Sequence, residues 1–248
     1  MPGTWLVLPT YNEAENIERL VASALAQLAE TGDHRILIVD DNSPDGTGRI
    51  ADRLAAEHPA VEVLHRTERE GLGPAYLAGF AYALDRGAGL VLEMDADFSH
   101  DPADLARLLA ASHDADLVLG SRYVAGGGVS DWGRVRRFVS RGGSWYAQRV
   151  LGLRIRDLTG GFKCFRREVL ETIDLPTIRS RGYAFQVELT HRAARAGFRI
   201  VELPIVFRDR RRGTSKMTWR IAGEAAILVP QLRFGASARR TSGHNARG

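Results

Sequence analysis

Short apolar runs that alternate with segments of helical periodicity constrain the fold of this chain more than any other feature. The runs are continuous rather than interrupted by polar residues, which is typical of parallel strands covered by helices on both faces. They lie at Thr4–Leu8, Arg35–Val39, Val61–Leu64, Leu90–Met94 and Asp116–Leu119. Helices are expected between them at Glu13–Ala29, Thr47–Glu57, Pro74–Leu84 and Pro102–Ala111. This order predicts an α/β fold with a mostly parallel, Rossmann-like sheet flanked by helices.

The pattern changes after Tyr123, where a glycine-rich segment, residues 125–131, interrupts the alternation. Beyond it we expect helices at Arg134–Leu151, Arg167–Ile173, Ala184–Ala196 and Met217–Arg233, and strands at Gly160–Phe165 and Arg199–Arg208. We therefore predict a single domain, residues 1–233, with two functional halves, 1–123 and 124–233. Residues 234–248 are expected to form a disordered basic tail.

Composition places the chain among ordinary globular proteins. Hydrophobic residues make up 44% and charged residues 26%, which excludes disorder as the main state. The single cysteine, Cys164, excludes an intramolecular disulfide and a cysteine-based metal site, and it fits a reduced, intracellular compartment. The first residues lack the basic start and apolar run of a signal peptide, and no uncharged apolar run approaches about 18 residues. We expect neither a signal peptide nor a membrane-spanning helix.

Charge is distributed unevenly along the chain. Residues 208–248 hold ten basic and two acidic residues and so carry +8, whereas residues 1–207 carry −4. Clustered positive charge attracts phosphate-rich partners such as a nucleotide, a lipid phosphate, a membrane surface or a nucleic acid. Two clusters are candidates, residues 208–216 and the group Arg134, Arg136, Arg137 and Arg141. The alternative for both is a solvated surface.

Carboxylates and one arginine follow the predicted parallel strands. Glu13 follows the first strand, Asp41 the second, Asp95 and Asp97 the fourth, and Arg122 the fifth. Because the carboxyl ends of parallel strands meet at one edge, these side chains are expected to gather where α/β sheets bind ligands. Crowded carboxylates repel each other unless a cation lies between them, and a divalent ion that also binds phosphate oxygens meets that need. The alternative for the Asp95–Asp97 pair is a turn and a helix cap.

Several of these positions keep more than one interpretation. A second Asp-x-Asp, Asp114–Asp116, precedes a strand and is expected at the opposite edge of the sheet as a turn. Asp41 either caps the Thr47–Glu57 helix or, if Asp45 or Thr47 does so, is free to hold a base or ribose. Tyr11 either stacks on a base or packs at the strand end.

The roles of two further residues stay open. Asp157 precedes two glycines that permit close backbone approach to a ligand, and it is a base, an acceptor contact or a turn residue. His100 either touches the metal site or begins a helix.

Two other classes of protein compete on the residues alone. Gly46–Ala51 matches the G-x-G-x-x-A pattern of dinucleotide-binding oxidoreductases, but it follows an acidic loop, and no acid follows the next strand. A nucleic-acid-binding protein agrees with the net charge of +4. The basic residues lack interleaved aromatics, however, and the acidic loops would repel a phosphate backbone, so no nucleic-acid partner is expected.

Eight motifs together resemble the polyprenol (dolichol) phosphate mannose synthases, inverting glycosyltransferases of family 2 with the GT-A fold. They are LPTYNE, VDDNSPDGTG, GLGPAY, MDADFSHDP, GSRYVAGGGVSDW, DLTGGFKCFRR, GYAFQVE and DRRRGTSKM, in order from Leu8 to Met217. The resemblance implies transfer of mannose from GDP-mannose to polyprenyl phosphate with Mg²⁺ or Mn²⁺. It also implies a peripheral location on the cytoplasmic side of a membrane, or a membrane-anchored partner. The nearest alternative is a glucosyltransferase or other glycosyltransferase that passes a sugar from a UDP-sugar to the same lipid.

The resemblance further implies residue roles, with residues 1–123 as the nucleotide-sugar-binding half and 124–233 as the acceptor-binding half. The nucleotide sugar would contact Pro9, Tyr11, Glu13, Val39, Asp41, Asp95, Ala96, Asp97, Arg122, Arg210 and Lys216. Asp95 and Asp97 would hold the metal, with Ser99 standing where some relatives have a metal-contacting glutamine. The acceptor phosphate would meet Arg122, Arg136, Arg137 and Asp157. The catalytic set would be Asp95, Asp97, Arg122 and Lys216.

Such an acceptor needs no dedicated general base. A phosphate monoester has a second pKa of about 6, so polyprenyl phosphate is mostly anionic near pH 7. The protein must instead orient two anions and neutralise both. We expect inversion at the anomeric carbon, which gives a β-linked product from an α-linked donor. The last predicted helix, through Ile221, Ala225, Leu228 and Leu232, is expected either to lie on the membrane or to pack on the domain.

Overall fold

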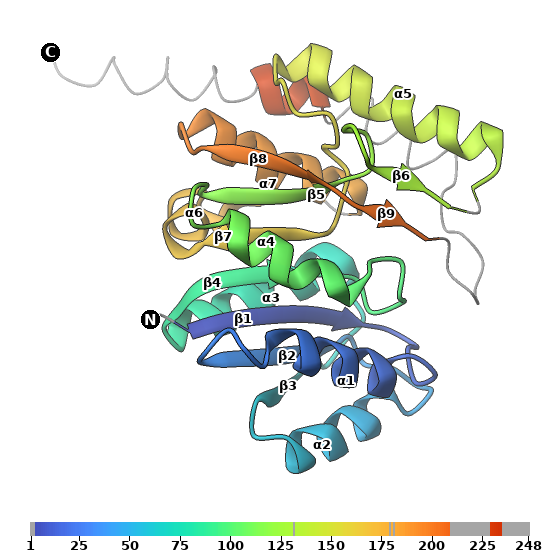
Figure 1. The fold of residues 1–248 in the computed structure, drawn as a ribbon, viewed down its shortest axis with the longest axis vertical. Helices are drawn as coiled ribbons and strands as arrows, with labels where there is room; N and C mark the ends of the chain where they lie inside the picture. Colours follow the sequence, from blue (N-terminus) through green and yellow to red (C-terminus); the bar gives the residue numbers. More distant parts are fainter. Residues whose placement is uncertain (1–2, 131, 179, 181, 209–228, 235–248) are drawn as a thin grey trace, which may run out of the picture.

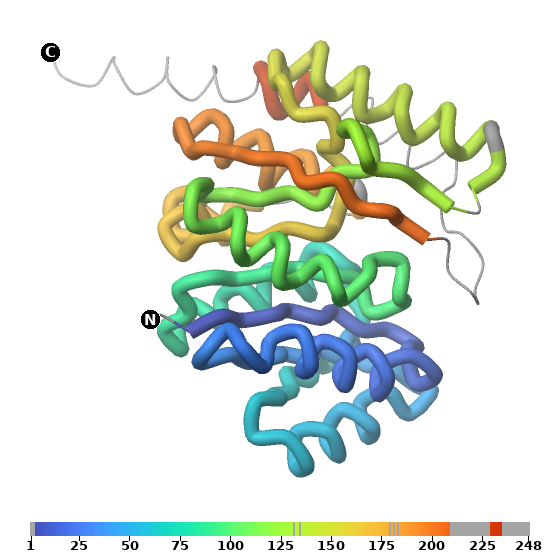
Figure 2. Tube along the Cα trace, in the orientation of Figure 1, coloured from blue at the N-terminus to red at the C-terminus, as the bar shows by residue number. Residues whose placement is uncertain are grey.

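A seven-stranded sheet with helices on both faces forms the body of the molecule (Figure 1). This computed structural model describes residues 3–130, 132–178, 180, 182–208 and 229–234. Figure 2 follows the chain from β1 and its blue neighbours at one end of the sheet to the orange and red C-terminal elements at the other. The β5 strand of the first half lies between β7 and β8 of the second half, so both halves share one sheet.

Six of the seven strands are parallel, which confirms the predicted sheet type. The strands are β1 (Gly3–Thr10), β2 (His34–Asp40), β3 (Val61–His65), β4 (Ala88–Glu93), β5 (Leu117–Ser121), β7 (Lys163–Arg166) and β8 (Ile200–Pro204). They lie in the order β3-β2-β1-β4-β7-β5-β8, and β7 runs antiparallel to both of its neighbours. The register pairs Thr10 with Asp40 and Val7 with Glu93, so β1, β2 and β4 end close together.

Alternating side chains of β1 divide the core between the two faces of the sheet. Trp5 and Val7 belong to one buried cluster and Leu6 and Leu8 to the other. The first cluster includes residues of α3 (Leu72–Asp85), α5 (Arg134–Leu151), α6 (Arg167–Thr172) and α7 (Tyr183–Arg195). The second includes residues of α1 (Ile17–Leu28), α2 (Thr47–Glu57) and α4 (Leu105–Ala111). The predicted apolar face of α1 is buried, as periodicity indicates.

Local interactions move some predicted boundaries. The α1 helix begins at Ile17 rather than Glu13, after a turn in which Asn16 donates its backbone N–H to Glu13 O at 2.9 Å. A short 3₁₀ turn, η1 (Pro102–Asp104), precedes α4, and a second, η2 (Leu175–Thr177), follows α6. The strand predicted over Arg199–Arg208 stops at Pro204 and resumes as β9 (Val206–Phe207). The β9 strand pairs with β6 (Gly128–Val129), inside the predicted glycine-rich loop.

Only the end of the last predicted helix lies among the described residues. Residues 229–234 are helical, Val229 is buried, and Arg233 Nη1 donates to Val150 O at 2.7 Å. This turn therefore packs on the domain. Residues 209–228 and the predicted tail beyond 234 lie outside the described part of the chain. No described helix is long and apolar enough to cross a membrane.

Candidate active site

A cavity of about 390 Å³ opens where β1, β2 and β4 end. It is lined by seven of the predicted contacts: Pro9, Tyr11, Glu13, Asp41, Asp95, Ala96 and Asp97. Other residues of the lining include Arg69, Glu70, Thr159, Gly161, Gly182 and Gln186. The structure therefore brings most of the predicted nucleotide-sugar contacts to one place. The cavity volume lies within the usual range of small-molecule sites.

Two aspartates after β4 are held in position at the cavity wall. Asp95 Oδ1 accepts a hydrogen bond at 3.3 Å from the hydroxyl of Tyr76, a fully buried residue of α3. Burial and the nearby Asp95 charge raise the pKa of Tyr76 well above its ordinary value, so the hydroxyl keeps its proton. Asp97 Oδ1 accepts the backbone N–H of Ser99 at 2.9 Å. Both carboxylates thus have a fixed orientation before any ligand binds.

The donor set fits a hard divalent cation that is shared with a substrate. Within the described ranges no group of three or more His, Cys, Asp or Glu side chains converges on one point. Mg²⁺ commonly takes one or two carboxylates and completes its shell with phosphate oxygens and water. Asp95 and Asp97 supply that number of carboxylates. Ser99, the third predicted ligand, does not line the cavity, and its buried hydroxyl has no hydrogen-bond partner among the described residues.

Asp41 does not cap α2 but lies in a hydrogen-bond network at the cavity wall. Its carboxylate accepts Arg66 Nη1 at 2.6 Å and the backbone N–H of Gly71 at 2.8 Å. Asp45, as the sequence allowed, accepts the backbone N–H of Thr47 at 3.0 Å at the start of α2. The strand-end aspartate and the loop before α3 are therefore joined, and this pairing fixes the cavity wall.

The remaining predicted nucleotide contacts differ in their placement. Arg69 lies over the ring of Tyr11, with 3.8 Å between the guanidinium carbon and the ring centroid. Val39 is fully buried in the core and does not line the cavity. Arg210 and Lys216 lie outside the described residues.

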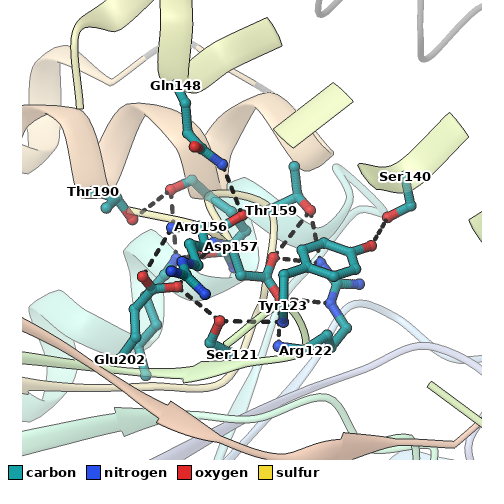
Figure 3. A network of polar contacts seen from close by, with 12 residues as sticks. Ser121, Arg122, Tyr123, Ser140, Gln148, Arg156, Asp157, Thr159, Thr190 and Glu202 are labelled. Atoms are coloured by element: carbon teal, nitrogen blue, oxygen red, sulfur yellow. Dashed lines mark hydrogen bonds and ion pairs between the residues drawn. The ribbon is translucent and has the colours of Figure 1, made fainter. Parts of the chain in front are cut away.

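Arg122 and Asp157 form a buried, bidentate ion pair beside the cavity (Figure 3). Arg122 Nε and Nη2 donate to the two carboxylate oxygens at 2.7 and 2.6 Å, and the Arg122 backbone N–H donates to the same group at 2.9 Å. Burial alone would raise the pKa of Asp157, but the charge and hydrogen bonds of Arg122 outweigh it and lower that pKa. A carboxylate held in this way is a poor general base, which leaves the contact and structural interpretations.

The pair connects the cavity to a second hollow. Arg122 Nη2 also donates to Thr159 Oγ1 at 2.7 Å, and Thr159 lines the first cavity. The next residue, Tyr123, donates its hydroxyl hydrogen to Ser140 Oγ at 2.6 Å, on α5, as Figure 3 shows. Tyr123 also lines the second hollow. Arg122 itself lines neither hollow, but it bonds to a residue of the first and precedes a residue of the second.

The second hollow is a groove of about 830 Å³ along α5. It is lined by Tyr123, Arg137, Phe138, Arg141, Gly142, Trp145, Gln148 and Arg156. The predicted acceptor residue Arg137 lies here, whereas Arg136 lies over the ring of Trp132, 4.2 Å from its centroid. Phe138 is 80% exposed and Trp145 is 59% exposed. Exposed aromatics beside arginines give the groove both apolar and anion-binding character.

The structure also places His100 and the second Asp-x-Asp motif. His100 is buried between Phe162 and Phe207, with centroid distances of 5.0 and 5.2 Å, and burial lowers its pKa to about 4. It does not line the cavity. Asp116, in the second Asp-x-Asp, accepts the backbone N–H of Arg199 at 2.8 Å just before β5. This second motif is therefore a turn at the opposite edge of the sheet, as predicted.

Sequence reasoning missed several residues of the cavity wall and its support. Arg69, Glu70, Thr159 and Gln186 line the cavity, and Arg66 and Tyr76 hold two of its carboxylates. The segments GLGPAY and GYAFQVE carry Tyr76 and Gln186 and were recognised only as whole motifs. A polar residue on the buried face of a predicted helix was the available signal for Gln186.

Comparison with known proteins agrees with this arrangement. Residues 5–174 match the sequence model of the family described as glycosyl transferase family 2. The chain is 49% identical over 233 residues to the undecaprenyl-phosphate mannosyltransferase of Micrococcus luteus, covering 94% of each protein. It is 47% identical over 230 residues to the polyprenol monophosphomannose synthase of Mycolicibacterium smegmatis, covering 92% of this chain and 86% of that protein.

A solved structure confirms the predicted GT-A fold class. Glucosyl-3-phosphoglycerate synthase from Mycobacterium tuberculosis, in complex with Mn²⁺ and UDP-glucose, superposes with a TM-score of 0.68 at 20% identity. The match covers 94% of this chain and 79% of that one. The family match contradicts the dinucleotide-dependent oxidoreductase suggested by Gly46–Ala51. On its sequence and its fold, the chain belongs to glycosyltransferase family 2.

Proposed function

We propose that this protein transfers mannose from GDP-mannose to a polyprenyl phosphate, with inversion and with Mg²⁺ or Mn²⁺. The observation that carries the proposal is that a cavity with two aspartates and a basic, aromatic groove lie on either side of the buried Arg122–Asp157 pair, through Thr159 and Tyr123. The first suits a nucleoside diphosphate sugar and the second a phosphate on an apolar chain. The relatives from Micrococcus luteus and Mycolicibacterium smegmatis, which carry the names of mannosyltransferases acting on such lipids, support the same acceptor.

In this mechanism Asp95 and Asp97 would hold the metal and so would orient the donor diphosphate. The metal, when bound, supplies positive charge to the departing nucleotide. Arg122 and Arg137 orient the acceptor phosphate and offset its charge as it approaches the anomeric carbon. Asp157 keeps Arg122 in place rather than removing a proton. The acceptor oxygen is already ionised, so the bond to mannose forms as the bond to the diphosphate breaks.

The charged residues at the cavity are consistent with these roles. Asp95 and Asp97 would repel a phosphate, so the donor binds there only with a cation. Arg210 and Lys216, which lie outside the described residues, are proposed to contact the departing diphosphate. Tyr11 and Asp41, which also line the cavity, are proposed to bind the nucleoside. The lack of a nucleic-acid partner remains an expectation from the acidic cavity.

Mass spectrometry of extracted lipid tests the proposal. Purified protein would be incubated with Mg²⁺, a short polyprenyl phosphate, and GDP-mannose or UDP-glucose in separate tubes. A hexosyl-phosphoprenol from GDP-mannose alone is the expected result. Product from UDP-glucose alone would overturn the sugar but keep the acceptor. No lipid product from either donor would overturn the acceptor, and a product of retained configuration by NMR would contradict inversion.

The exposed face of α5 is proposed to bring the enzyme to the membrane surface, on the cytoplasmic side, where a polyprenyl phosphate would be reached. Phe138 and Trp145 are exposed, and Arg149 lies 5.4 Å from the centroid of Trp145. Aromatic side chains that enter the headgroup region beside arginines are typical of peripheral membrane helices. The same face meets the groove, so the lipid phosphate would enter directly from the membrane.

Changing Phe138 and Trp145 together to glutamate is expected to reduce cosedimentation with anionic liposomes by about fivefold or more, because apolar burial and headgroup attraction are both lost. Turnover of a short, water-soluble polyprenyl phosphate should fall less than turnover of a liposome-embedded one. The matched control changes Ala22 and Ala56 to glutamate, which adds the same charge on α1 and α2 at the other end of the sheet. Equal liposome binding by the two variants would contradict a membrane role for α5.

A further inference from the structure

Gln186 of α7 is a buried polar residue at the cavity wall that has no part in the mechanism proposed for the two aspartates and Arg122. Its side chain lines the cavity with Asp95 and Asp97, yet the residue is 2% exposed. Its amide oxygen accepts a hydrogen bond from Lys163 Nζ. Lys163, the first residue of β7, is fully buried and pairs with Glu93 of β4 at 3.1 Å. A buried ion pair therefore supports one side of the amide.

The lysine fixes the orientation of the amide. An ammonium group only donates, so the oxygen of Gln186 has to face Lys163 and the NH₂ group has to face the other way. The main chain of Gln186 is held as well, because its carbonyl accepts Thr190 Oγ1 at 3.0 Å and Lys163 Nζ at 3.4 Å. Gln186 thus presents a fixed hydrogen-bond donor.

That donor lies at the cavity wall beside Gly161. Nε2 of Gln186 meets the geometric criteria for a hydrogen bond with none of the described residues, although the amide interacts with the Glu93 carboxylate and opposes the rise in the pKa of Glu93 that burial causes. A Cβ atom placed on Gly161 would lie 3.4 Å from Nε2 and 3.6 and 3.7 Å from the two carboxylate oxygens of Asp95. Gly161 therefore leaves open a space between the amide and a proposed metal ligand. An NH₂ group has two hydrogens, so the one that does not face Glu93 is left for a ligand acceptor in this space.

We propose that Gln186 binds a hydroxyl group of the donor hexose and that Lys163 is its positioning residue. This inference rests on the proposed function. The sugar is placed in the space beside Asp95 because the cation that Asp95 would hold binds the diphosphate to which the sugar is attached. A neutral amide donor suits a hydroxyl oxygen. A second phosphate is disfavoured there because the Asp95 carboxylate faces the same space.

Calorimetric titration with GDP and with GDP-mannose, both with Mn²⁺, separates a sugar contact from a nucleotide contact. For Gln186→Ala we expect GDP-mannose to bind about tenfold more weakly and GDP within about twofold of the unchanged protein. Gly161→Ala places a methyl group in this space, at a residue whose φ is not positive. It should also weaken binding of GDP-mannose about tenfold and leave binding of GDP within about twofold. Gln27→Ala makes the same chemical change on α1, at a residue that does not line the cavity, and it should leave both affinities unchanged.

The outcomes distinguish this inference from the proposed function. Equal weakening of GDP and GDP-mannose by Gln186→Ala, or no change in either, would overturn the sugar contact and leave the proposed function standing. Failure of the unchanged protein to bind GDP-mannose or GDP would overturn both for that donor. A parallel titration with UDP and UDP-glucose would then show whether Gln186→Ala weakens UDP-glucose more than UDP, and such a difference would support the contact with a hexose.

Discussion

Changing Asp97 to asparagine is expected to lower kcat/KM for mannose transfer by about 10³-fold while the fold stays intact. The substitution keeps the shape of the side chain, and its amide oxygen can still accept the Ser99 backbone N–H. It removes the charge that a hard divalent cation requires of its ligand. A 10³-fold loss corresponds to about 4 kcal/mol of transition-state stabilisation, the size expected when charge stabilisation is removed. Steady-state kinetics over a range of Mn²⁺ concentrations measure it, with thermal melting to check the fold.

The chain supplies its own control for this experiment. Asp114 belongs to the second Asp-x-Asp, which lies before β5 at the opposite edge of the sheet. Asp114→Asn makes the same chemical change and should leave kcat/KM within about twofold. If Asp97→Asn keeps activity within tenfold at every metal concentration, Asp97 is not a metal ligand. Equal losses in both variants would indicate a general effect of lost surface charge instead.

The sequence was sufficient for those features of the fold that local patterns determine. Continuous apolar runs marked the strands, and the spacing of Ile17, Leu20 and Leu28 marked the buried face of α1. Because parallel strands end at one edge, the positions of Asp41, Asp95 and Asp97 in the chain were enough to predict that they line one cavity. The antiparallel insertion of β7 between β4 and β5 had no local signal, since it depends on pairing between distant segments.

Partners far apart in the chain account for what the sequence left open at the site. The sequence did not indicate that Asp41 is paired, because its partner Arg66 lies 25 residues away. Asp157 kept three interpretations because Arg122 lies 35 residues away. Gln186 drew no notice because the cavity that it lines forms only when α7 packs beside β7 and the loop after β4. Sequence patterns identify the residue types at a site. Which of their charges are already paired depends on contacts that form only when distant segments fold together.

Removing Asp157 alone is expected to destabilise the protein by about 3–5 kcal/mol, because it leaves the buried guanidinium of Arg122 without its counter-charge. For a chain of this size the loss corresponds to a fall in Tm of about 10 °C. The pKa of Asp157 is lowered in the fold, so the pair contributes fully above the unfolded-state value of about 3.9 and is lost only as pH falls through the lower, folded-state value. The fall in Tm for Asp157→Ala should therefore be constant between about pH 6 and pH 8.

The double variant Arg122→Met with Asp157→Leu separates the structural role of the pair from its proposed role in the reaction. Replacing both partners with apolar groups of similar size removes two buried charges together, so most of the lost stability should return. Activity should not return, because no guanidinium then lies between the cavity and the groove; we expect kcat/KM to stay about 10²-fold or more below that of the unchanged protein. Melting curves and kinetics on the two single variants and the double variant complete the cycle. A double variant that regains both stability and activity would show that Arg122 is purely structural, and the acceptor phosphate would then have to be held by α5 alone.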